Sequence, residues 1–152
     1  MEDAPATILT NPQDFAALEL GFVDLGRVPQ YLPRWAQNNL LVDTRWAASH
    51  RAAVVAFLRS YIRATRYFYD PANRSDVIAI LAKRTRTTTQ IAAATYELYV
   101  RDEVIAPEAA LYEEGIKANL DAFLVMGEIK EAPPLASFID ARFLAEAQRS
   151  AP

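Results

Sequence analysis

The sequence predicts a helix-rich α/β domain in which a few strands are followed by five or so helices. Two observations lead to this fold class. Residues 6–45 contain short apolar stretches separated by glycine and proline, which is typical of strands and turns. From Ser49 onward, apolar residues recur at spacings of three and four, which is typical of amphipathic helices. We therefore expect a strand-containing α/β segment with a crossover strand at residues 1–45 and a helical region at 46–152, within one continuous domain.

Three strands and one short helix are predicted in the first segment. The stretches "ATILT" (6–10), "GFVDLG" (21–26) and "NNLLVDT" (38–44) are the strand candidates, and "PQDFAALEL" (12–20) has the apolar spacing of a helix. A loop that carries Pro29 and Pro33 precedes the third strand. This order predicts strand, helix, strand, loop and strand.

The second segment is predicted to hold successive helices with recognisable ends. The longest begins near Ser49 as N-cap and ends at Asp70, because the following proline cannot continue it. A threonine cap, Thr87 or Thr88, opens a later helix. The expected helices are 49–70, about 71–84, a third that starts near 88, a fourth from Ala106 to Gly127, and a last one at 141–150 after a proline-bounded loop at 131–140.

Composition limits the classes of function. The 152-residue chain is 52% hydrophobic and 23% charged, as expected for a folded domain. Its net charge of -3 gives no basic field, so we expect no nucleic-acid partner. The absence of cysteine excludes disulfides, thiolate metal ligands and a cysteine nucleophile. The apolar runs are too short to span a bilayer and no signal peptide precedes them, so we expect no membrane insertion.

Most charged candidates are better interpreted as solvated side chains. His50 is the only histidine and has no cysteine or suitably spaced carboxylate for a metal site. Glu113 and Glu114 fall on the polar side of a helix. A basic cluster could hold an anion: Arg59, Arg63 and Arg66 in the long helix, followed by Lys83, Arg84 and Arg86. The three arginines of the long helix lie opposite its apolar stripe, so a solvated helix face is the better interpretation. We therefore expect no catalytic residue, no metal site and no cofactor.

The stretch "YLPRWAQNNLLV" is a candidate for ligand binding. It places the aromatic residues Tyr31 and Trp35 next to the amides Gln37, Asn38 and Asn39 in a loop that leads into a strand. A stacking face beside uncharged hydrogen-bonding groups suits a small polar or anionic solute. A plain surface loop could have the same composition.

Three parts of the chain carry a resemblance to a known family. They are the run from Leu9 to Phe22, the segment "YDPANRSDVIAILAK" at 69–83 and the ending "PPLASFID" at 133–140. Their order and spacing resemble the C-terminal half of the nitrate/sulfonate/taurine-type solute-binding proteins of ABC importers, a family that also contains the binding proteins for thiamine-pyrimidine precursors. The resemblance implies a fragment of a type II periplasmic-binding-protein fold.

The resemblance also implies which residues would contact a solute. Loops of both lobes contribute in that family, and the matching positions are Thr10, Asn11 and Pro12 after the first strand and Gln37 and Asn38 before the crossover strand. With Tyr31 and Trp35 they form the candidate ligand-binding set. By family analogy the solute is a small organic or anionic molecule, the partner is an importer permease and the location is periplasmic. Without a signal peptide in this chain, the alternative location is cytoplasmic.

The resemblance implies that only the later half of such a protein is present, and this leaves alternatives open. A clamshell binds its solute between two lobes, and one lobe would be missing. The uncovered strands at Ala6–Thr10 and Leu40–Val42 would then pair with another copy, so we expect a homo-oligomer. The alternative is an orphaned half-fold that acts as a self-associating structural or interaction protein. A relative of the thiamine-pyrimidine enzymes is disfavoured, because their cysteine-rich motif is absent.

Overall fold

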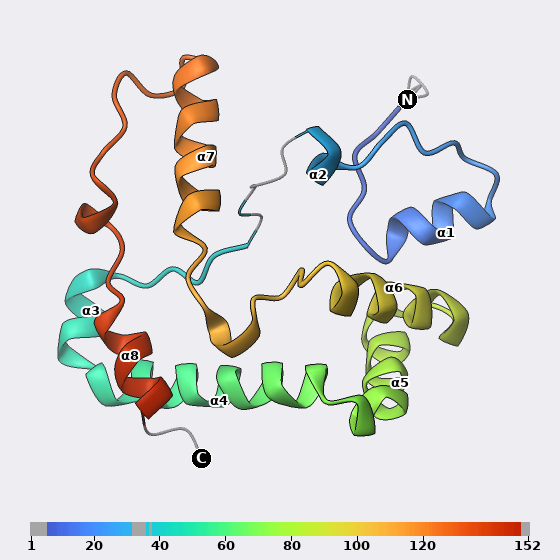
Figure 1. The fold of residues 1–152 in the computed structure, drawn as a ribbon, viewed down its shortest axis with the longest axis horizontal. Coiled ribbons are helices and arrows are strands. Elements are labelled where there is room, and N and C mark those ends of the chain that lie inside the picture. Colours follow the sequence, from blue (N-terminus) through green and yellow to red (C-terminus); the bar gives the residue numbers. More distant parts are fainter. Residues whose placement is uncertain (1–5, 32–35, 37, 150–152) are drawn as a thin grey trace. The chain divides into compact units, whose positions relative to one another are not determined.

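The structure is a computed structural model that describes residues 6–31, 36 and 38–149. Over these residues it contains eight α-helices and three short 3-10 helices (Figure 1). The chain divides into two compact units. The first combines residues up to Leu25 with Phe68–Ile105, and the second combines Gly26–Tyr67 with the residues from Ala106 onward.

The first unit is built around a pair of packed helices. Its elements are α1 (Gln13–Glu19), the last two residues of α4, the 3-10 turn η1 (Pro71–Asn73), α5 (Arg74–Thr85) and α6 (Thr89–Arg101). Helices α5 and α6 pack against each other (Figure 1). Their buried side chains form the core of this unit: Val77, Ile78, Ala92 and Tyr96, with Phe68, Leu81, Ala82, Ala93 and Val100 around them.

Local sequence explains why this helix pair turns where it does. Arg86 has φ 56 and ψ 40, a left-handed conformation that ends α5, after Lys83 and Arg84 in the last turn. Two residues later the side chain of Thr88 accepts a hydrogen bond from the Ile91 N–H at 3.2 Å and caps α6. These features set the short connection that brings the two apolar faces together.

The second unit contains the long helix and the C-terminal helices. Its elements are α2 (Val28–Tyr31), α3 (Thr44–Ser49), α4 (Arg51–Tyr69) up to Tyr67, η2 (Pro107–Ala109), α7 (Glu113–Val125), η3 (Leu135–Ser137) and α8 (Arg142–Arg149). Helix α8 packs against α4 through Val55, Ile62 and Ala147 (Figure 1). The Arg51 guanidinium adds a two-nitrogen contact to the Glu146 carboxylate, at 2.9 and 2.5 Å. Because this pair is exposed, the apolar contacts stabilise the packing more than the ion pair does.

The predicted strands are wrong. The described part of the chain contains no strand, so it is all-helical and not α/β, and no strand of a type II periplasmic-binding-protein fold is seen. The stretches 6–10, 21–26 and 38–44 have strand-like composition but form no ladder with one another. A strand exists only when a neighbour supplies its hydrogen bonds, and the described residues place no such neighbour beside these stretches.

The predicted helices are largely confirmed. Helix α1 covers the predicted helix in 12–20, α4 the predicted 49–70, and Thr88 is the N-cap of α6. The prediction for 106–127 begins too early, because Glu108 and Ala109 have positive φ and the regular helix starts only at Glu113. The proline-bounded loop contains a single 3-10 turn, η3. None of the helices in the described residues has the length and apolarity needed to cross a membrane.

Candidate functional site

Thr10, Asn11 and Pro12 lie together in the first unit, where they begin α1. The Thr10 carbonyl accepts hydrogen bonds from the N–H groups of Gln13 at 2.9 Å and Asp14 at 3.3 Å. The Asn11 amide donates to the Asp14 carboxylate at 2.7 Å, and Pro12 is buried. These contacts give Asn11 and Pro12 a local structural role at the start of a helix.

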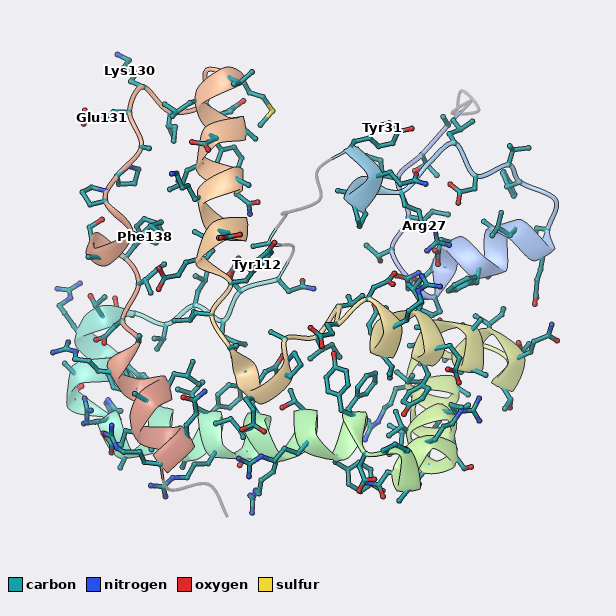
Figure 2. All side chains as sticks on the ribbon, viewed as in Figure 1. Arg27, Tyr31, Tyr112, Lys130, Glu131 and Phe138 are labelled. Atoms are coloured by element: carbon teal, nitrogen blue, oxygen red, sulfur yellow. The ribbon has the colours of Figure 1, made fainter. Side chains whose placement is uncertain are left out.

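The rest of the predicted set belongs to the second unit or lies outside the described residues. Tyr31 ends α2 and is exposed, with its ring over Gly26, where a Cβ would lie 2.6 Å from the Tyr31 hydroxyl (Figure 2). Asn38 is exposed, and Trp35 and Gln37 lie outside the described residues. Among the described members of the set, Thr10, Asn11 and Pro12 lie together within one unit.

His50 is exposed, in agreement with its interpretation as a solvated residue. It is the C-cap of α3, and its ring stacks on Trp46 with centroids 4.4 Å apart and planes 7° from parallel. Its Nδ1 lies 2.9 Å from the Ser49 hydroxyl and 3.0 Å from the Trp46 carbonyl oxygen. Among the described residues, no group of three or more histidine and carboxylate side chains could hold a metal ion.

The basic residues of α4 are engaged in different ways. Arg66 makes a forked contact to Glu108, with Nε–Oε1 at 2.7 Å and Nη2–Oε2 at 2.8 Å. This hydrogen bonding lowers the pKa of the Glu108 carboxyl below its ordinary value. Arg63 lies 3.5 Å from the Ser60 hydroxyl, and the half-buried Arg59 has an Nε with no hydrogen-bond acceptor within the described chain. The three arginines of α4 therefore do not converge on one anion site.

Helix α7 carries a shallow, open hollow of about 300 Å³. It is lined by Glu114, Lys117, Ala118 and Asp121. This spacing of three and four places them on one face of the helix. Binding pockets for small molecules are mostly apolar and enclose the ligand. An open hollow on a single helix does not enclose a ligand, so it is not a binding pocket of this kind.

A more specific arrangement fixes the chain beside α7, at Ala36. The Asn119 side chain accepts a hydrogen bond from the Ala36 N–H at 3.3 Å and donates one to the Ala36 carbonyl at 2.7 Å. The amide therefore pairs with both backbone groups of one residue, as a neighbouring strand would. Ala36 is buried, and Gly115 permits the close approach, because a Cβ there would lie 3.0 Å from the Ala36 nitrogen. We call this contact the Asn119 clamp.

The residues that follow the clamp form an exposed, extended stretch at 38–42, here termed the edge segment (Figure 1). Its backbone groups make no hydrogen bond to other described residues. Leu41 is 92% exposed, while Leu40 and Val42 are exposed to a lesser degree, which is the alternation of an extended chain. The segment ends at Asp43, whose side chain accepts from the Trp46 N–H at 2.8 Å and caps α3.

Sequence reasoning missed Asn119 and Gly115. Both lie in a helix whose apolar spacing gave no reason to single them out. Their role depends on Ala36, which is about eighty positions away in the chain. A glycine inside a predicted helix was the one available signal, because glycine is unfavourable there unless a close approach requires it.

Comparisons with protein-family models, curated proteins and solved structures found no match to this chain. The resemblance to solute-binding proteins therefore stays a prediction from the sequence.

Proposed function

We propose that this chain is a self-associating interaction module, which completes its apolar burial by binding a second copy of itself. The observation that carries the proposal is the set of large apolar side chains that the described residues of each unit leave exposed. A second copy of the chain can cover these side chains, which a single copy leaves in water.

The kind of surface exposed supports the same proposal. Large apolar side chains are exposed in the first unit at Ile8, Leu20, Phe22, Val23 and Leu25, and in the second at Leu40, Leu41 and Val42. Most of them are neighbours in the sequence: Leu20, Phe22, Val23 and Leu25 lie within six positions, and Leu40, Leu41 and Val42 are consecutive. Contiguous apolar patches of this kind mark interaction surfaces in soluble proteins.

Sedimentation velocity over a range of micromolar concentrations tests the proposal. We expect a discrete species of twice the 17.0 kDa chain mass, or a larger closed assembly, whose fraction rises with concentration. A single 17.0 kDa species at every concentration would contradict self-association.

Solute binding, the function implied by the resemblance, is measured on the same sample. Native mass spectrometry reports the assembly and any retained small molecule together. A retained organic anion in a monomer would favour solute binding over self-association.

A further inference from the structure

We infer that residues 39–43 pair antiparallel with the same residues of a second copy across a two-fold axis at Leu41. These residues are the last four of the edge segment together with Asp43, which follows it. This inference rests on the proposed self-association and names the surface that carries it. In the isolated chain these residues form no ladder, and the pairing would arise only on association.

The sequence of the segment is self-complementary about Leu41. An antiparallel pair centred there places Leu41 opposite the second copy's Leu41 and Leu40 opposite the second copy's Val42. It also places the Asn39 amide opposite the second copy's Asp43, so a hydrogen-bond donor faces a carboxylate. A two-fold interface requires this property, because each position must suit its own symmetry mate.

The segment is fixed at both ends before any partner binds. The Asn119 clamp holds the backbone at Ala36, and the Asp43 side chain ties the other end to the first turn of α3. The described residues between them, 38–42, contain no glycine, proline or charge, and their backbone groups make no hydrogen bond to other described residues. Such a stretch loses little conformational entropy on binding, and its unpaired groups are a template for another chain.

The other apolar stretches are less suited to self-pairing. In residues 20–25, a two-fold axis at Val23 would set Phe22 opposite the second copy's Asp24 and bury a carboxylate against an aromatic ring. That stretch also lies between Gly21 and Gly26, which have φ values of 88 and 138 and leave the extended conformation. Neither objection applies at 39–43.

Opposite charges at the axis test the inference directly. Leu41→Asp and Leu41→Lys each place two like charges opposite each other and remove the leucine contact, so each variant should raise the dimer dissociation constant about tenfold or more. A mixture of the two variants should form a heterodimer, because the charges are then complementary. Since Leu41 is 92% exposed, neither substitution should unfold the chain, and circular dichroism checks this.

Val125→Asp is the matched control, because Val125 is 89% exposed and lies at the end of α7, outside the edge segment. We expect this variant to dimerise as the unmodified chain does. If the unmodified chain is monomeric, the proposed function and this inference both fail. If it dimerises and the Leu41 variants dimerise equally well, or if only Val125→Asp dissociates the dimer, the inference fails and self-association stands.

A covalent measurement gives a second, independent result. The chain has no cysteine, so a Leu41→Cys variant carries a single thiol. Directly opposed residues of antiparallel strands bring their Cβ atoms close enough for a disulfide in favourable pairs. Mild oxidation should therefore convert Leu41→Cys to a covalent dimer, while Val125→Cys should stay uncrosslinked. Equal crosslinking of both would overturn the inference.

Discussion

The α5–α6 pair and the edge segment contain similar proportions of apolar residues but bury them very differently. In the helix pair, Ile78, Ala92 and Tyr96 are buried in one contiguous core. In the edge segment, Leu40, Leu41 and Val42 are all exposed. The difference follows from the backbone: each helix satisfies its own hydrogen bonds, so two adjacent helices suffice to form a core. An extended segment needs a neighbouring strand before its side chains can be buried.

The comparison separates two roles for apolar residues in this chain. Those on helix faces stabilise the folded unit in which they lie. Those on the extended stretches contribute little to folding, because the same side chains are exposed before and after the chain folds. Substitutions in the two regions should therefore affect different measured quantities.

The largest expected effect is the loss of stability from truncating Tyr96. Tyr96 is buried, and its ring lies 5.3 Å from that of Phe68, so Tyr96→Ala should lower the free energy of unfolding by about 3–5 kcal/mol. Leu41→Ala should leave it nearly unchanged at concentrations where the chain is monomeric. Urea unfolding followed by circular dichroism measures both variants. Equal losses would show that the edge segment is part of the folded core.

A smaller effect is expected from removing the Asn119 clamp. Asn119→Ala deletes both hydrogen bonds to Ala36 and leaves buried backbone groups unpaired, so the free energy of unfolding should fall by about 1–3 kcal/mol. Hydrogen exchange of the Ala36 amide, which donates to Asn119, should become faster. Asp121→Ala, an exposed change on the same helix, is the control and should alter neither quantity.

The smallest effect is a dependence of stability on pH. The Arg142 side chain donates to Asp140 at 2.9 and 2.8 Å and lowers the pKa of Asp140 from 3.8 to about 2. Because this pKa is lower in the folded chain, the contribution is present above about pH 4 and is lost as the pH falls toward 2. Both groups are largely exposed, so the effect is small.

Asp140→Asn should remove this part of the pH dependence while it keeps the oxygen that accepts from the Arg142 N–H. Arg142→Ala should remove the same part of the dependence of the unfolding free energy on pH. The measurement is urea unfolding at intervals between pH 2 and 6. An unchanged slope in both variants would show that other carboxylates control acid unfolding.

The helices could be predicted from the sequence because their signals are local. The apolar spacing of α4, the proline after Asp70 and the threonine cap at Thr88 all act within one or two turns. The strands could not be predicted correctly from composition, because alternation describes a side-chain pattern and not the presence of a partner. The late start of α7 depends on positive φ at Glu108 and Ala109, two residue types that rarely adopt it.

Less of the candidate site could be predicted. The apolar character of Leu40–Val42 and its pairing with another copy were predicted from the sequence, and the pairing stays a prediction. Asn119 could not be found, because an asparagine in a helix gives no indication of a backbone contact far away in the chain. Thr10, Asn11 and Pro12 were selected through the resemblance, and the structure places the last two in the start of α1.

The tethering of the edge segment has a consequence for the lifetime of the chain. A backbone that is extended, exposed and free of hydrogen bonds is the form in which proteolysis most readily occurs. The hydrogen bonds at Ala36 and Asp43 fix the chain on both sides of Leu41. In an unpaired copy the backbone near Leu41 would be accessible to a protease, whereas in a paired copy it would be covered. Turnover would then remove single copies selectively, and association would determine how long each chain persists.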